Sequence, residues 1–255
     1  MANRLRVAVA LAITAGMLAG GAEAALVQVG DLVLRADGGF RPNVLPRRAF
    51  APIRFHGHAD LSSRSGAMPP ALQQAIVDFD RDGLMRTAGL ASCAPEQVAD
   101  SGPEEARRDC GAAIVGTGRV EALVALAGLP PQATGSALTL FNGPRQGGEA
   151  TVIAHAQMTG PVVQTFAILI PVERRRGRFR YRASFEVPPI APGLGSGALT
   201  HVSVKVGRRY RAAGKRRSYV WARCSDNILE THGRFTFSDG TVVDGTVMKG
   251  CRARR

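Results

Sequence analysis

The chain has 255 residues, of which 33 are basic and 20 acidic, so its formal net charge is +13. That length is sufficient to bury a sizeable core in one domain or two, and beyond the N-terminal segment no run is apolar and long enough to span a membrane. The charge excess rests on arginine. Because alanine and glycine are also abundant, this bias is typical of a GC-rich genome and does not by itself indicate a polyanion partner.

The first residues have the layout of a secretory signal peptide. Arg4 and Arg6 precede an apolar run, Val7 to Ala19, and Ala22-Glu23-Ala24 forms a small-residue cleavage site. The apolar run is short for a bilayer span, and no cysteine stands beside the cleavage site to carry a lipid anchor. We therefore expect residues 1–24 to be removed on export and the protein to be secreted or held in the cell envelope. A membrane anchor is the competing interpretation.

Residues 25–255 are dominated by runs in which apolar and polar residues alternate, the pattern of half-buried strands. In Ile53 to Leu61, "IRFHGHADL", the alternation is complete, and in Thr200 to Val206 three valines face one way. Similar runs occur at Leu26 to Arg35, Ala112 to Ala127, Ala137 to Phe141, Thr151 to Met158 and Ser218 to Cys224.

Two hairpins and one short helix complete the predicted elements. Asp239-Gly240 supplies a tight turn between alternating arms, and the segment Thr165 to Val187 turns near Arg174 to Gly177. Pro103, followed by two glutamates, suits the start of a short helix. The sequence thus predicts an all-β fold, a disulfide-stapled β-sandwich of about a dozen strands. A split into two lobes at residues 128–135, "GLPPQATG", is the alternative.

Four cysteines, an even number, indicate disulfides in an exported protein. Three pairings are open, and we favour the local one, Cys93 with Cys110 and Cys224 with Cys251. None of the four lies in a C-x-x-C spacing, so zinc and redox sites are disfavoured. We expect two structural disulfides.

The stretch "VDFDRDGLMRT" resembles the start of an EF-hand loop, with Asp78, Asp80, Asp82 and Gly83 at the right spacing. Arg86 then occupies the ninth position, and the glutamate required at the twelfth is missing. We therefore interpret Asp82-Gly83 as the tight type I′ turn of a hairpin. A calcium site of another type is the alternative.

Catalytic and metal motifs are missing from the sequence. There is no G-x-S-x-G, H-E-x-x-H or S-x-x-K pattern, no phosphate loop and no dinucleotide fingerprint. His56, His58 and Asp60 share one strand face and suit zinc or copper as donors, but a solvated strand face explains them equally well. We expect no catalytic residue, no metal and no cofactor.

Two basic segments carry the strongest functional signal. The first, "ERRRGRFRYR", holds three arginines, Arg178, Arg180 and Arg182, that alternation places on one strand face with Tyr181 opposite. The second is "KVGRRYRAAGKRR". Clustered charge of this kind attracts anionic polymers. For a secreted protein, anionic cell-wall polymers are a better expectation than nucleic acid. The alternative is that these arginines only form a solvated exterior. The candidate residues are Arg174, Arg175, Arg176, Arg178, Arg180, Arg182, Arg208, Arg209, Arg211, Lys215, Arg216 and Arg217.

The layout as a whole resembles a known family. The elements "VGDLVLRADGGFRP", "DFDRDGLMRTAGLASC", "CGAAIVGTGRVEALV", "LTLFNG" and "KRRSYVWARC…FTFSDGT…GC" are similar to those of an uncharacterised family of secreted, β-rich actinobacterial proteins with paired cysteines. The resemblance extends over nearly all of the chain after the signal peptide. It implies an exported β-rich protein and a turn after the "DFD" strand, and it supplies no activity or ligand.

Three functions follow as hypotheses. The first is a non-catalytic secreted or envelope-associated protein with a structural or binding role. The second is a polyanion-binding module of the cell envelope that uses the two basic segments. The third is an extracellular hydrolase with scattered catalytic acids.

Overall fold

The computed structural model describes residues 24–254, and twelve of their strands form one antiparallel sheet. The predicted signal peptide, apart from Ala24, lies outside the described residues. In spatial order the sheet contains β1 (Ala25–Val29), β2 (Leu32–Arg41), β5 (Arg54–Ser63), β13 (Gly195–Val206), β8 (Ile114–Leu126), β9 (Gln132–Asn142), β10 (Ala150–Met158), β11 (Gln164–Arg174), β12 (Phe179–Glu186), β6 (Leu72–Asp80), β17 (Ile228–Phe237) and β18 (Val242–Gly250).

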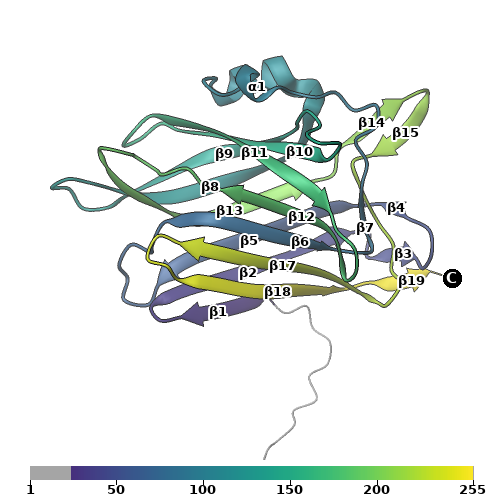
Figure 1. Ribbon diagram of the computed structural model, residues 1–255, viewed down its shortest axis with the longest axis horizontal. Coiled ribbons are helices and arrows are strands. Elements are labelled where there is room, and N and C mark those ends of the chain that lie inside the picture. Colours follow the sequence, from purple (N-terminus) through teal and green to yellow (C-terminus); the bar gives the residue numbers. More distant parts are fainter. Residues whose placement is uncertain (1–23, 255) are drawn as a thin grey trace, which may run out of the picture.

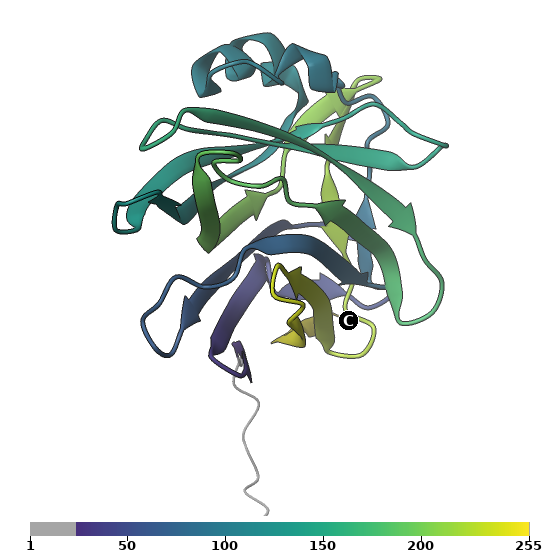
Figure 2. The same cartoon turned by 60° about the vertical axis from the view of Figure 1, so that its left-hand side comes forward.

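This sheet folds over on itself until its two edge strands meet. β1 and β18 lie side by side, with the Val27 side chain against the backbone of Gly245. Figures 1 and 2 show the result as two layers, with β8 to β13 above and β1, β2, β5, β6, β17 and β18 below. The predicted all-β, disulfide-stapled fold is confirmed, and both layers belong to one continuous sheet.

The remaining strands are short and gather at one end of the layers. β3 (Val44–Pro46) pairs in parallel with β19 (Arg252–Arg254), β4 (Ala51–Pro52) and β7 (Gly83–Met85) flank β16 (Val220–Ala222), and β14 (Arg209–Ala212) and β15 (Lys215–Ser218) form a hairpin. Figure 1 shows this hairpin projecting from the end of the molecule that holds β4 and β7.

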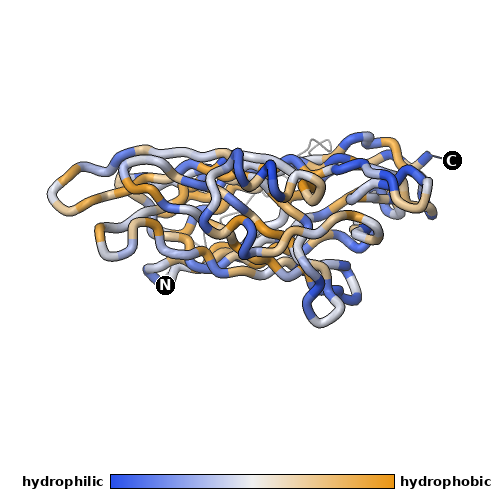
Figure 3. Tube along the Cα trace, turned by 90° about the horizontal axis from the view of Figure 1, so that it is seen from above, coloured by the Kyte–Doolittle hydropathy of each residue, from blue (hydrophilic) through white to orange (hydrophobic). Residues whose placement is uncertain are grey.

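Alternation along the strands builds the interior, as Figure 3 shows by the alternating hydropathy of successive residues. Val120 and Leu138 from the upper layer, and Leu34 and Leu61 from the lower, are buried. Leu199 packs against the apolar clusters of both layers and joins them. Apolar area removed from water stabilises a fold by about 25 cal/mol per Å², so this shared interior holds the two layers together.

The outer face of β9 and β10 is also covered. Phe141 and Ile153 are fully buried beneath the segment 91–113, which contains α1 (Pro103–Cys110) and the 3-10 turns Pro95–Gln97 and Gly111–Ala113. Figure 1 places α1 directly above these strands. The helix begins at Pro103, as the sequence predicts, with two glutamates in its first turn and two arginines in its last.

Two sequence expectations need correction. The run Leu26 to Arg35 is not one strand, because the chain reverses at Gly30, where φ is 59°, and forms β1 and β2. Residues 128–135 are not a linker between lobes: they hold the turn between the paired strands β8 and β9 and the start of β9 itself. The turns at Asp239-Gly240 and at Arg174 to Gly177 lie where the sequence predicts them.

Both predicted disulfides are confirmed. Cys93 bonds to Cys110 and Cys224 to Cys251, and all four residues are buried. The first joins the two ends of the cover over β9 and β10. The second ties the start of the segment 224–227 to the end of β18, within a cluster that includes Leu45 and Ala222.

Each disulfide closes a loop of moderate size, 17 and 27 residues in sequence separation. Restricting a loop of this length in the unfolded chain stabilises a protein by about 3 kcal/mol. We expect the double replacement Cys93→Ala with Cys110→Ala to lower the free energy of unfolding by about 3 kcal/mol, as measured by urea denaturation, and the Cys224→Ala, Cys251→Ala pair to have an effect of similar size. A loss well under 1 kcal/mol from either pair would contradict the loop-closure account.

Candidate anion-binding groove

The aspartate stretch does not form the predicted hairpin. β6 ends at Asp80 and β7 begins at Gly83, but β6 pairs with β12 and β17 whereas β7 pairs with β16. Neither Asp82 nor Gly83 has the positive φ of a type I′ turn. The tight-turn interpretation is therefore wrong, and the chain instead crosses here from the large sheet to the three-stranded one.

The chain crosses here, rather than turning at the surface, because all three aspartates are buried and have partners far along the sequence. Asp78, 3 % exposed, receives two parallel hydrogen bonds from the Arg182 guanidinium, at 2.8 and 2.7 Å. Asp82 is fully buried and accepts from Arg223 Nε and from the backbone N–H of Ser225, both at 2.7 Å. A surface turn would leave these carboxylates in water, where the ion pairs contribute little.

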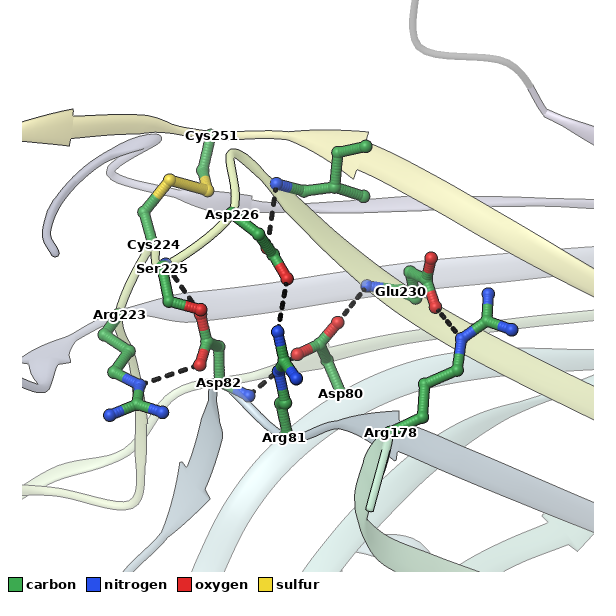
Figure 4. Close-up of polar contacts among 11 residues, drawn as sticks. Asp80, Arg81, Asp82, Arg178, Arg223, Cys224, Ser225, Asp226, Glu230 and Cys251 are labelled. Atoms are coloured by element: carbon green, nitrogen blue, oxygen red, sulfur yellow. Dashed lines mark hydrogen bonds and ion pairs between the residues drawn. A yellow bond between two sulfur atoms is a disulfide. The ribbon is translucent and has the colours of Figure 1, made fainter. Parts of the chain in front are cut away.

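Asp80 lies between the other two and has no cationic partner among the hydrogen bonds it accepts. Its oxygens accept the backbone N–H groups of Asp82, at 2.7 Å, and Glu230, at 2.9 Å. Figure 4 shows the resulting network at the end of β6, next to the Cys224–Cys251 disulfide. The network fixes the start of β7 and the segment after β16 relative to β6 and β17.

Within residues 24–254, no group of three or more histidine, cysteine or acidic side chains converges in a way that could hold a metal ion. His58 and Asp60 lie on the outer face of β5, as alternation predicts. Asp60 forms a 2.7 Å contact with His201 Nδ1, and the His58 and His201 rings stack at 6.4 Å.

The arginines of the first basic segment do not act as one set. Arg178 pairs with Glu230, and Arg182 pairs with Asp78. Arg180, next to a bulge in β12, donates to the carbonyl of Arg81 and lies over the Phe50 ring. Arg178 and Arg182 thus have acidic partners that a sequence window does not reveal, whereas Arg180 has none among the ion pairs of the described residues.

Arginines from several parts of the chain converge on a groove made of two adjoining hollows. The first hollow, about 540 Å³, lies between β7, the loop before β10 and the end of β11, and the second, about 500 Å³, lies at the β11–β12 turn. Leu84, Arg174 and Tyr181 line both. We call the two together the arginine groove. The arginines that line it are Arg86, Arg145, Arg174, Arg175, Arg176, Arg180 and Arg217.

The charged side chains that line this groove are nearly all positive. Among the described residues that line it, Glu149 is the single acidic side chain. Several arginines are held by neutral groups: Arg145 donates to the carbonyl of Gly148 at 2.7 Å, and Arg86 lies over the Trp221 ring at 4.8 Å. Such contacts orient a guanidinium without neutralising its charge, so the groove carries an excess of positive charge.

Five of the twelve predicted basic residues line the groove: Arg174, Arg175, Arg176, Arg180 and Arg217. Sequence reasoning missed Arg86 and Arg145, since each stands alone among neutral neighbours. Only the fold brings them to the others, through the pairing of β7 with β16 and the loop before β10.

The second basic segment forms the β14–β15 hairpin beside the groove. The Tyr210 hydroxyl shares its one proton between the carbonyl oxygens of Arg86 and Ala88, at 3.3 and 3.2 Å, and so attaches the hairpin to one wall of the groove. Arg211 and Arg216 are exposed and directly opposite each other in the ladder, an arrangement of like charges that costs stability. Arg208, Arg209 and Lys215 are exposed as well.

The fully buried carboxylate of Asp82 gives a first prediction for the aspartate network. Asp82→Ala would leave Arg223 and the Ser225 N–H without their acceptor, so we expect a loss of about 3 kcal/mol in the free energy of unfolding, measured by urea denaturation. Glu121→Ala is the matched control, because it breaks the exposed Arg119–Glu121 pair and should cost under about 1 kcal/mol. Equal losses in the free energy of unfolding from the two variants would show that burial of the Asp82–Arg223 pair does not add to stability.

The second prediction concerns pH. Burial raises the pKa of the Asp80 carboxyl above its ordinary value of 3.8, and Asp82 and Asp226 act in the same direction, against the two N–H donors. The folded protein thus keeps this proton at pH values at which the unfolded chain has released it. The contribution of Asp80 to stability therefore falls as the pH rises from the unfolded to the folded pKa.

Asp80→Asn removes this titration. We expect the free energy of unfolding of the parent, relative to the variant, to increase when the pH is lowered from about 7 to about 4, as followed by urea denaturation at several pH values. A difference that stays flat over this range, or that decreases, would contradict a raised pKa.

No helix within residues 24–254 has the length and apolar character needed to cross a membrane. No family model, no curated protein and no solved structure matches this chain.

Proposed function

We propose that this protein is a non-catalytic binding protein for anionic polymers, exported by its signal peptide and acting in the cell envelope or outside the cell. The observation that carries the proposal is the arginine groove, which seven arginines from separate parts of the chain line together with one acidic residue, Glu149, among the described residues. The two disulfides are consistent with an oxidising compartment.

The convergence of like charges supports a binding role. Arg86, Arg145, Arg174 and Arg217 are brought to one hollow by folding, and mutual repulsion of cations opposes that arrangement. Arg175, in the second hollow, does have an acidic partner, Glu173, and Arg178 outside the groove pairs with Glu230. The other six arginines of the groove form no ion pair within residues 24–254. An anionic ligand would offset the repulsion that remains in the groove.

Guanidinium groups suit the ligand class. Each presents several N–H donors in a planar fork that matches carboxylate, phosphate and sulfate oxygens. Arg86, Arg145, Arg174, Arg175 and Arg176 are exposed and therefore accessible to a polymer that lies along the surface. All four cysteines are bonded, so no thiol nucleophile supports the hydrolase alternative.

Wall polymers remain a better proposal than nucleic acid. Single-stranded nucleic acids bind through aromatic side chains on which bases stack, in addition to cations. Tyr181 is buried, and the Tyr210 hydroxyl is engaged in attaching the β14–β15 hairpin. The groove thus offers charge and an apolar floor but no exposed tyrosine platform among its described residues.

Salt-dependent retention on a heparin column tests the proposal. The triple variant Arg86→Gln, Arg174→Gln, Arg217→Gln should elute at clearly lower salt than the parent, because each lost contact removes one counterion release and reduces the salt slope by roughly 0.7 to 0.9. The control carries Arg64→Gln, Arg108→Gln and Arg252→Gln, three exposed arginines outside the groove.

The control has the same net charge as the groove variant and should elute close to the parent. If both triple variants weaken retention equally, binding follows net charge alone and the groove is not the site. If the groove variant elutes like the parent while remaining folded, the proposal is wrong.

A further inference from the structure

We infer that the arginine groove takes a linear polymer whose anionic groups are separated by carbon-skeleton units, and that it binds at least two consecutive units, one in each hollow. This inference rests on the proposed function and adds to it the form of the ligand. It comes from three features: the division of the groove, the chemistry of its floor, and the charged hairpin at one end.

The groove is divided at Arg174. This residue, with Leu84 and Tyr181, lines both hollows, while Arg175 and Arg176 line only the second and Arg217 only the first. The hollows are therefore consecutive along one path. Each has the volume of a small-molecule site, so each accommodates one polymer unit and Arg174 lies where two units join.

The floor of the first hollow is apolar, whereas its rim is cationic. Leu84, Met85 and Val172 line it together with the arginines, and Met85 is positioned by a hydrogen bond from its N–H to the Tyr181 hydroxyl, at 3.4 Å. Apolar surface gains nothing from contact with phosphate or sulfate, but it packs well against C–H groups. A chain that alternates carbon-rich units with anionic groups matches both parts.

The path continues beyond the first hollow. Arg217 lies in β15, whose neighbours on the hairpin include the exposed Arg209, Arg211 and Arg216. The register places Arg217 and Tyr210 on one face of the hairpin and the other three arginines on the opposite face. A polymer that leaves the first hollow past Arg217 therefore meets this third cationic segment by passing around the edge of the hairpin. The like-charge pair of Arg211 and Arg216 would be relieved by an anionic group bound between them.

Chain length should then control affinity. Once the first unit is bound, the next is held near its own hollow at an effective concentration that reaches the millimolar range for short connections, and the combined affinity exceeds that of either unit alone. A ligand with only one anionic unit does not have this gain in affinity. Affinity should rise steeply at the length that first occupies both hollows, and again, less steeply, at the length that reaches the hairpin.

The experiment uses heparin-derived oligosaccharides of two, four, six and eight sugar units, titrated calorimetrically into the protein at one fixed low salt concentration. We expect a gain of at least about tenfold in affinity between the shortest fragment and the first one that spans both hollows. Arg174→Gln should reduce that gain to under about threefold, whereas Arg108→Gln, on the exposed face of α1, should leave it unchanged.

A second arm uses inorganic polyphosphate of matched charge, which has no carbon skeleton, and should bind more weakly than the oligosaccharide. Fragments of a polyol phosphate polymer, which carry phosphate instead of sulfate on a carbon skeleton, are titrated at the same lengths. Comparing their affinities with those of the heparin fragments separates a preference for sulfate or phosphate from the effect of chain length. Polyphosphate that binds as tightly as the matched oligosaccharide would overturn the role of the apolar floor.

The outcomes separate the two proposals. Binding that increases only gradually with length, and is affected equally by Arg174→Gln and Arg108→Gln, would overturn the two-unit groove while leaving a polyanion-binding surface. Failure of every probe to bind at any length would overturn the proposed function itself.

Discussion

Burial of the Asp82 carboxylate is the constraint on which the end of the molecule that holds the arginine groove depends. A fully buried charge must be paired and hydrogen-bonded, and both of its partners, Arg223 and Ser225, follow β16. Their attachment holds β16 beside β7. β7 supplies Leu84 and Met85 to the floor of the arginine groove. The Asp82 carboxylate, which lies outside the groove, therefore determines the position of this floor.

The two kinds of arginine in this protein differ in what surrounds them. Arg182 and Arg223 are paired with buried aspartates and belong to the fold. Arg86 and Arg145 are oriented by an aromatic ring, a carbonyl and a hydroxyl, which leave the charge uncompensated. Both side chains are exposed. A guanidinium that is already held in place loses little side-chain entropy when it forms a further hydrogen bond.

Local patterns predicted the fold well because strand alternation and turn chemistry are properties of short windows. The β-strands at Ile53 to Leu61 and Thr200 to Val206, the turn at Asp239-Gly240 and the helix from Pro103 all follow from neighbouring residues. The pairing of the cysteines also followed, since both partners of each disulfide are close in sequence.

Where the sequence misled, the deciding partner was far along the chain. Asp82 resembled a turn residue, but its partner Arg223 is 141 residues away. Arg178 and Arg182 resembled a free cationic face, but Glu230 and Asp78 lie 52 and 104 residues from them. Ion pairs at such separations are set by strand order, which no window of ten or twenty residues contains.

The meeting of β1 with β18 has a consequence for the order in which the molecule is completed. These strands stand near opposite ends of the described chain, so they can come to lie side by side only when nearly the whole polypeptide is present. Contacts of such long sequence separation form slowly. Until then the edges of β1 and β18, which have no ladder between them, are not even covered by each other and are liable to join other chains. A protein of this topology therefore exposes both sheet edges while it folds, and a chaperone that shields strand edges would raise its yield.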